Sequence, residues 1–357
     1  MRYGEIHGTD SIVGLENEIK FMVDIFGTLG PSCNDEATLK AMFMAGMTGV
    51  RINLSHVMLR DNEELLNFVK RAAESVCIDP KILIDLQGPE LRIGNLQKEI
   101  NLCSGDEIPV RCEGYHGVIS DVIPLDKRIF EEMEEGDEIL LDDGKILAGV
   151  EHRSNNEAIL KIIRGGILNS RKSILIKGKT ILMPTLTSDD ISNISDAVKL
   201  GVTGVMQPFV RNRQDIQILR KTLDDAGGDK IEIYAKIENM DGVGMLPDIM
   251  DECDEIVIAR GDLGNAMPLW ELPYVQKRIS KECRTRSKRF MVVTQMLASM
   301  EHSPIPTRAE VSDIYNAVAD GASSVMVTGE TAIGEYPVEV IGFLSKTALQ
   351  YEKSKKI

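Results

Sequence analysis

The chain has 357 residues, of which 43% are hydrophobic and 27% charged, and its formal net charge at pH 7 is −15. This composition is typical of a globular protein with a large apolar core, and without a run of about 18 apolar residues we expect no membrane span. The acidic balance argues against a general nucleic-acid binder, which carries a basic face. None of the six cysteines forms a C-x-x-C pair, and no secretory signal begins the chain, so we expect free thiols in the cytoplasm.

Short apolar runs alternate with amphipathic stretches along the chain. The runs that we interpret as strands are 21–27, 49–55, 81–86, 204–210, 231–237, 255–261, 290–295 and 323–329. Two of the stretches between them have helix signals, with Asp35 as the expected cap and Gly46 as the stop of one, and Ser188 and Gly201 in the same roles in the other. Strand and helix alternation with nearly continuous apolar strands indicates a parallel sheet. Eight such units predict an α/β fold, a (β/α)8 TIM barrel.

The pattern changes between the third and fourth runs, where short alternating strands are separated by Gly, Asp and Asn turns. We therefore predict that residues 93–183 form a β-rich lid domain inserted after barrel strand 3. Residues 1–92 and 184–357 would form the TIM-barrel catalytic domain. The insertion leaves the barrel at its catalytic mouth and could close over a site there. An amphipathic helix at 337–357 would complete the barrel, with no further domain behind it.

In a barrel of this kind, catalytic side chains come from the C-terminal ends of the strands. The second strand has Arg51, Asn53 and Ser55 at alternate positions, so all three side chains share one face. Ordinary hydrogen bonds to loops are the alternative interpretation. The fifth strand has Lys236 and Glu238 on one face. A buried lysine beside a carboxylate is costly for structure alone, and it suits a metal-binding carboxylate next to a cation that stabilises negative charge. A mutual salt bridge is the alternative here.

Three later strand ends add polar groups. After the sixth strand, an Arg-Gly-Asp-Leu-Gly turn opens a helix, where backbone N–H groups at Gly261 could bind an anion and Asp262 could supply a second oxygen to Mg²⁺. Thr294 and Thr328 end the seventh and eighth strands, although threonine is also an ordinary strand residue. Together these groups predict a small anionic, enolate-forming or phosphorylated substrate. The residues alone leave both phosphoryl transfer and metal-assisted aldol chemistry open.

The motifs that carry this chemistry resemble those of the pyruvate kinase family, in family order from about residue 21 to 342. They are TLGPSC, GMTGVRINLSH, LQGPELRIG, LLDDG, GGILNSRK, AKIENMDGV, IVIARGDLG, TQMLASM, PTRAEVSDIYNAVADGASSVMVTGETA and GEYP. The resemblance implies phosphoryl transfer from phosphoenolpyruvate to ADP, giving pyruvate and ATP, with Mg²⁺ (or Mn²⁺) and K⁺ as cofactors. It also implies a cytoplasmic glycolytic enzyme that forms a homodimer or another small homo-oligomer and has no membrane or nucleic-acid partner.

The resemblance further implies roles for the matching residues. The implied catalytic residues are Lys236, Arg51, Thr294 and Thr328. The implied substrate-binding residues are Arg51, Gly261, Asp262 and Thr294. The implied nucleotide-binding residues are Pro31, Asn53, His56, Arg92, Asp143 and Lys172. The implied metal ligands are Glu238 and Asp262 for Mg²⁺, and Asn53, Ser55, Asp85 and the carbonyl of Leu86 for K⁺. Glu90 stands where a glutamate of the family accompanies K⁺ dependence.

Four features depart from the family pattern. The C-terminal regulatory domain that usually follows the barrel is missing, which predicts an unregulated minimal form. Ile333 and Gln87 stand where lysines are common, and Pro208 stands where a serine is common. If the lysine replaced by Ile333 contacts the nucleotide, its loss removes about 1.5–3 kcal/mol of binding. The alternatives are a diverged paralogue that uses its Mg-enolpyruvate site for another acceptor or for C–C chemistry, and a non-catalytic protein that binds phosphoenolpyruvate or pyruvate.

Overall fold

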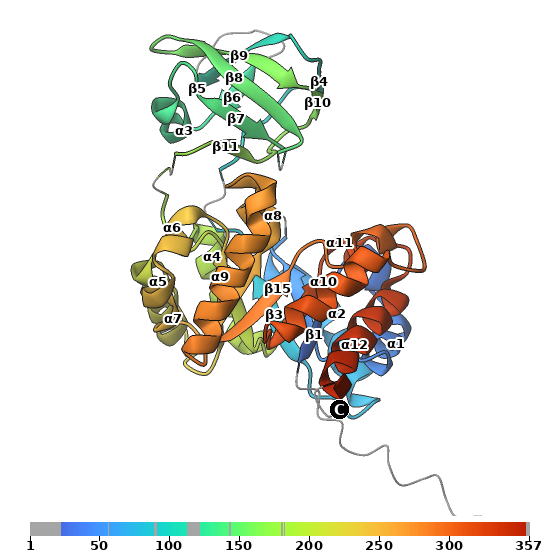
Figure 1. The fold of residues 1–357 in the computed structure, drawn as a ribbon. Coiled ribbons are helices and arrows are strands. Elements are labelled where there is room, and N and C mark those ends of the chain that lie inside the picture. Colours follow the sequence, from blue (N-terminus) through green and yellow to red (C-terminus); the bar gives the residue numbers. More distant parts are fainter. Residues whose placement is uncertain are drawn as a thin grey trace, which may run out of the picture.

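The structure of the protein is a computed structural model that has two bodies, a barrel surrounded by helices and a smaller β-rich lid above one end of it (Figure 1). It describes residues 23–55, 57–88, 91–112, 122–142, 144–179, 181 and 183–354. The chain leaves the barrel after its third strand, builds the lid, and returns to complete the barrel. In the part of the chain that the structure describes, no helix combines the length and the apolar character needed to cross a membrane.

The barrel is closed by eight parallel strands in the order β1-β16-β15-β14-β13-β12-β3-β2. Their bounds are β1 (Asp24–Thr28), β2 (Gly49–Asn53), β3 (Lys81–Asp85), β12 (Gly204–Gln207), β13 (Glu232–Ile237), β14 (Glu255–Ala259), β15 (Arg289–Val293) and β16 (Ser324–Val327). Each of the eight predicted runs overlaps one strand, so the predicted TIM barrel is confirmed. Side chains such as Phe26, Leu83, Tyr234 and Met291 fill the barrel interior, each buried almost completely.

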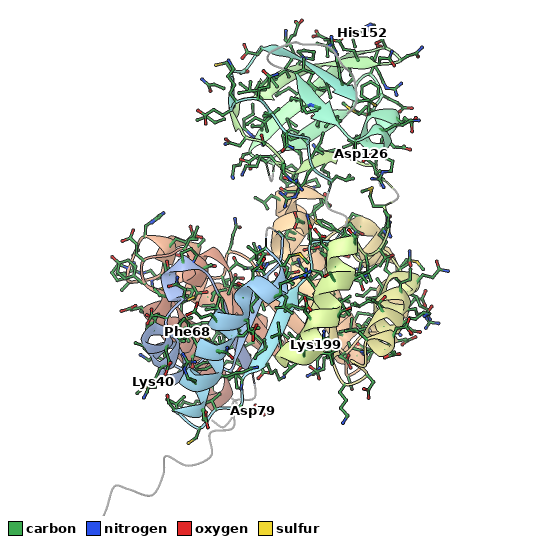
Figure 2. All side chains as sticks on the ribbon, turned by 180° about the vertical axis from the view of Figure 1, so that it is seen from behind. Lys40, Phe68, Asp79, Asp126, His152 and Lys199 are labelled. Atoms are coloured by element: carbon green, nitrogen blue, oxygen red, sulfur yellow. The ribbon has the colours of Figure 1, made fainter. Side chains whose placement is uncertain are left out.

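Helices form the outer layer and cover the other face of the strands. The longer ones are α1 (Glu36–Met44), α2 (Glu63–Glu74), α4 (Ser188–Leu200), α5 (Arg213–Asp225), α9 (Leu272–Thr285), α10 (Arg308–Ala319) and α12 (Pro337–Ser354). Shorter helices are α6 (Met240–Gly244), α7 (Leu246–Met250), α8 (Arg260–Asn265) and α11 (Gly329–Ala332), and single 3-10 turns are η1 (Pro31–Cys33), η2 (Leu59–Asn62), η3 (Leu269–Glu271) and η4 (Ala298–Glu301). Figure 2 shows the same layer from behind, with Phe68 on α2 and Lys199 on α4.

Of the four predicted helix signals, those at Asp35 and Gly201 are confirmed, Gly46 directly follows the C-cap Ala45 of α1 with φ 112°, and the one at Ser188 is wrong. The Asp35 side chain accepts a hydrogen bond from the backbone N–H of Thr38 and caps α1. Gly201 ends α4 in the left-handed conformation, with φ 76°. The prediction that Ser188 caps α4 is wrong, because Thr187 is the cap. Its hydroxyl and the Asp190 carboxylate exchange hydrogen bonds with each other's backbone N–H, a reciprocal arrangement that a cap at Ser188 would not provide.

The lid contains a six-stranded sheet in the order β11-β7-β8-β9-β5-β6 and a two-stranded sheet of β10 and β4. Its elements are β4 (Ile100–Leu102), β5 (Glu107–Cys112), β6 (Ile123–Leu125), α3 (Lys127–Glu132), β7 (Glu138–Leu141), β8 (Ile146–Arg153), β9 (Glu157–Arg164), β10 (Gly166–Leu168) and β11 (Ile174–Ile176). It has its own apolar core, around residues such as Val110, Phe130 and Leu160. Figure 2 shows His152 at the end of the lid far from the barrel.

The lid approaches the barrel at α8. Gly144, in the turn between β7 and β8, lies against the side chain of Asn265, because a Cβ atom at Gly144 would be 2.9 Å from Asn265 Oδ1. Figure 1 shows α8 rising toward the lid next to β11. A cavity of about 150 Å³ lies between the two bodies, and it is lined by lid residues such as Leu140 and Leu175 and by Phe209 and Glu238 of the barrel. The mouth of the barrel therefore faces a pocket that both bodies line.

Candidate active site

Four of the charged residues form one network at the C-terminal ends of the strands. Arg51 in β2 donates from Nε and Nη2 to Asp85 Oδ2 at 2.9 and 2.6 Å. Lys236 in β13 donates to both oxygens of Asp85 at 3.1 Å, and its Nζ lies 3.0 Å from Glu238 Oε1. The four side chains are only 1–14% exposed. Closure of the barrel thus brings two cations and two carboxylates, far apart in the sequence, into one buried cluster.

The pKa values of this cluster follow from burial and from the opposite charges. Burial raises the pKa of Asp85, but Lys236 and Arg51 lower it by more, so that the pKa of Asp85 lies below its usual value. Burial lowers the pKa of Lys236, while Asp85 and Glu238 raise it to a value above the ordinary lysine range. Both groups are therefore charged at neutral pH. The mutual salt bridge of Lys236 and Glu238 is present, but Asp85 shares the ammonium group, so Lys236 serves as the centre of a network.

Thr28, which the sequence patterns did not single out, fixes Arg51 from the other side. Its Oγ1 accepts a hydrogen bond from Arg51 Nη1 at 3.2 Å and donates to the carbonyl of Val327 at 2.8 Å. The carbonyl of Thr28 accepts a hydrogen bond from Thr331 Oγ1 at 2.9 Å. Thr28 is 3% exposed. The sequence signal for it was its position as the first polar residue after the apolar part of the first run.

Glu238 and Asp262 are suited to holding a divalent ion together with a substrate. Both line the cavity between the lid and the barrel. Glu238 is held in place because its Oε2 accepts the backbone N–H of Phe209 at 2.8 Å. Among the described residues, no group of three or more His, Cys, Asp or Glu side chains could hold a metal ion by itself. Two hard carboxylates on neighbouring strand ends fit Mg²⁺, which takes its other ligands from water and substrate oxygens.

The predicted K⁺ ligands lie at the ends of the neighbouring strands β2 and β3. Asn53 pairs in register with Asp85 of β3. The Ser55 N–H and hydroxyl both donate to Asn53 Oδ1, at 3.2 and 2.9 Å, and the N–H of Leu86 donates to the carbonyl of Met206. These groups offer amide, hydroxyl and carboxylate oxygens, a donor set that fits a hard monovalent cation. The Asp85 carboxylate faces Arg51 and Lys236 in this arrangement.

The predicted carboxylate-binding residues lie side by side. A Cβ atom at Gly261 would be 3.2 Å from Thr294 Cγ2, so the turn before Asp262 rests on the Thr294 side chain. Thr294 and Gln295 both have positive φ, of 82° and 54°. Such a conformation costs on the order of 1–3 kcal/mol per residue and is unusual for a β-branched side chain. The end of β15 is therefore a strained turn next to α8.

Thr328 and Glu330 are engaged with each other at the end of β16. The N–H and Oγ1 of Thr328 donate to Glu330 Oε2 at 2.6 and 3.2 Å, and Glu330 Oε1 accepts the N–H of Leu297. Glu330 is 1% exposed, and its carboxylate ties two loops together through these hydrogen bonds.

Two of the positions that depart from the family pattern have different surroundings. Ile333 is 66% exposed. The N–H of Gln87 donates to the buried carboxylate of Asp190, a second residue that the sequence patterns did not single out.

Two predicted nucleotide residues lie in the lid connection. Arg92 Nη1 donates to the carbonyl of Arg171 at 2.8 Å, and Lys172 Nζ lies 2.8 Å from the Asp142 carboxylate. Arg92 is joined to this segment by a β-bridge with Ser173. Pro31 is exposed and begins the turn η1. The predicted residues His56, Glu90 and Asp143 lie outside the described part of the chain.

Comparison with known proteins finds one family model and several relatives that match most of this chain. The family model described as "Pyruvate kinase, barrel domain" matches residues 21–341. A protein named pyruvate kinase from Chlamydia pneumoniae is 37% identical over 331 residues, which cover 92% of this chain and 68% of the relative. One from Aeropyrum pernix is 36% identical over 325 residues, covering 91% and 69%, and one from Mycobacterium intracellulare is 35% identical over 323 residues, covering 89% and 68%.

Proposed function

Because the chain belongs to the pyruvate kinase family, we propose that it transfers a phosphoryl group from phosphoenolpyruvate to ADP. The bond between phosphorus and the enol oxygen breaks, and a bond to a terminal oxygen of ADP forms. The enolate that remains takes a proton at its methylene carbon and becomes pyruvate. The observation that carries the proposal is the buried network of Arg51, Asp85, Lys236 and Glu238 beside the cavity.

The chemistry asks the protein mainly for positioning and for neutralisation of charge. Arg51 would contact the phosphoryl group in transit, and Lys236 would stabilise both that group and the enolate oxygen. Because both cations are buried, their fields act with little screening by water. The backbone around Gly261 and the hydroxyl of Thr294 would hold the substrate carboxylate. Thr328 would belong to the network that delivers the proton.

The proposed cofactors are Mg²⁺, held by Glu238 and Asp262, and K⁺, held by oxygens of Asn53, Ser55, Asp85 and Leu86. When bound, the ions would neutralise negative charge on the phosphoryl group and the enolate. We also propose that the protein acts in cytoplasmic glycolysis as a small homo-oligomer. The exposed side chains of Leu269, Trp270 and Tyr274, together on η3 and the start of α9, support an interface of this kind.

A coupled assay tests the proposed reaction. The purified protein should form ATP and pyruvate from phosphoenolpyruvate and ADP in the presence of Mg²⁺ and K⁺. Lys236→Ala should abolish turnover while the fold is kept. The matched control is Lys81→Ala, because Lys81 pairs with Asp24 at 2.6 Å at the opposite end of the barrel strands, and it should retain turnover. Failure of the unaltered protein to form ATP across several salts would refute the proposal.

One observation favours a second candidate function. The side chain at position 333 is apolar and 66% exposed, so it offers a nucleotide phosphate neither a charge nor a donor. An enzyme that keeps the Mg-enolpyruvate site but uses another acceptor would then exchange the methyl protons of pyruvate with D₂O in the presence of Mg²⁺ while using ADP poorly. Assays with several nucleoside diphosphates, together with proton exchange followed by NMR, separate the two functions.

A further inference from the structure

Arg260 connects the two segments that meet at the predicted carboxylate site. Its backbone begins α8, directly before Gly261 and Asp262. Its side chain crosses to the end of β15, where Nε and Nη2 donate to the carbonyl oxygen of Thr294 at 3.0 and 2.6 Å. The Arg260 side chain is 12% exposed. These charge-assisted hydrogen bonds are therefore largely shielded from water. Such bonds are stronger in the protein interior than in water.

The carbonyl that Arg260 binds belongs to the strained turn. Thr294 and Gln295 both lie in the left-handed region, which a β-branched residue such as threonine rarely adopts. A conformation of this kind persists only where the surrounding structure holds it. Nε and Nη2 of Arg260 hold this conformation in place, because both bind the carbonyl oxygen of the peptide group between Thr294 and Gln295. The same turn places the Thr294 side chain against Gly261.

Asp313 binds the guanidinium of Arg260 at the nitrogen that does not contact Thr294. Arg260 Nη1 donates to Asp313 Oδ2 at 2.6 Å, and Asp313 lies in α10, well after the strained turn in the sequence. Because the guanidinium is planar, a carboxylate on Nη1 sets the direction of the other N–H groups, which here point at Thr294. A chain of contacts thus runs from α10 through Arg260 to Thr294 and Gly261.

We propose that Arg260 and Asp313 are positioning residues, which hold the Thr294 hydroxyl and the Gly261 backbone in the arrangement that binds the substrate carboxylate. They act through Thr294 and not on the reacting atoms. The identity of the substrate rests on the proposed function. The positioning role of Arg260 and Asp313 does not rest on that function, because any small carboxylate bound by Thr294 and Gly261 depends on the same contacts.

The test measures binding of oxalate, a planar dicarboxylate, by calorimetry in the presence of Mg²⁺. Arg260→Gln should weaken oxalate binding about tenfold and raise the KM for phosphoenolpyruvate by a similar factor, with a smaller change in kcat. Arg260→Lys should recover part of the loss, and Asp313→Asn should give a smaller loss. The matched control is Arg289→Gln at the start of the same strand, where Arg289 pairs with Glu232 at 2.7 Å. It should bind oxalate like the unaltered protein.

A double-mutant comparison separates positioning from general loss of structure. Because Arg260 holds the Thr294 hydroxyl, the double variant Arg260→Gln with Thr294→Ala should lose less oxalate affinity than the sum of the two single losses. Additive losses, or unchanged oxalate affinity in Arg260→Gln, would overturn the inference. Absence of oxalate binding by the unaltered protein would overturn it as well. A protein that binds oxalate but forms no ATP would refute the proposed reaction while leaving the inference supported by its own readout.

Discussion

The sharpest consequence of the buried network concerns Asp85, whose carboxylate is shared by two cations. Arg51 approaches to 2.6 Å and Lys236 to 3.1 Å, and Asp85 is 3% exposed. At an effective dielectric constant of about 20, the pair with Arg51 attracts by roughly 6 kcal/mol and the pair with Lys236 by roughly 5 kcal/mol, before the cost of burial is counted. Asp85→Asn would leave both cations buried without this carboxylate, and removal of one partner from a buried ion pair costs about 3–5 kcal/mol. We expect a loss of that size in the free energy of unfolding.

The pH dependence of this stabilisation has a definite sign. The pKa of Asp85 is lower in the folded than in the unfolded chain, so its contribution is present above the unfolded value of about 3.9 and is lost as the pH falls through the folded value. The unfolding free energy of Asp85→Asn should therefore depend less on pH below about 4 than that of the unaltered protein.

The measurement is urea unfolding followed by circular dichroism at pH 7 and at several acidic pH values. Asp24→Asn is the matched control, because Asp24 forms an ion pair with Lys81 at 2.6 Å but is 29% exposed. Partly exposed pairs contribute about 0–1 kcal/mol, so this variant should unfold close to the unaltered protein. If Asp85→Asn unfolds within about 1 kcal/mol of the control, the two cations are not held by Asp85 in the way described.

Three further predictions follow from single contacts. Thr28→Val removes the acceptor of Arg51 Nη1 and the donor to the Val327 carbonyl; it should lower kcat about tenfold and lower the melting temperature, because buried partners lose a hydrogen bond worth about 1–3 kcal/mol, and a normal kcat would contradict this role. Glu330→Gln removes a buried charge that accepts hydrogen bonds from two loops and should cost about 1.5–3 kcal/mol of stability, read as a lower melting temperature, whereas an unchanged one would show that the charge is dispensable. Ile333→Lys should lower the KM for ADP about tenfold or more, by one charge-assisted contact; an unchanged KM would show that the nucleotide lies elsewhere.

The barrel could be predicted because its strands are buried on both faces, and each therefore appears as a continuous apolar run. The positions of Lys236 and Glu238 followed from alternation along one strand, which needs no knowledge of neighbours. The sharing of Asp85 between Arg51 and Lys236 did not follow in this way. It depends on barrel closure, which places β3 beside β2 and only one strand away from β13.

The strained turn was also beyond prediction from the sequence. Nothing in the residues around Thr294 marks a left-handed conformation, because neither glycine nor asparagine stands there. The conformation is imposed by the guanidinium of Arg260, a contact between segments more than thirty residues apart. Glu330 illustrates the same limit, since the sequence patterns assigned it no role and the structure shows that its carboxylate ties two loops together.

The charge balance of the network bears on how a substrate and a metal would enter together. Arg51 and Lys236 contribute two positive charges, and Asp85 and Glu238 contribute two negative charges, in a region that is almost free of solvent. An anionic substrate alone would disturb this balance and would compete with Asp85 for both cations. If Glu238 and Asp262 hold a divalent cation, as proposed, its charge would offset the added negative charge of the substrate. In the structure Lys236 is held between Asp85 and Glu238. If the cation shared Glu238, the ammonium group would be less restrained on that side and would be better able to face the substrate.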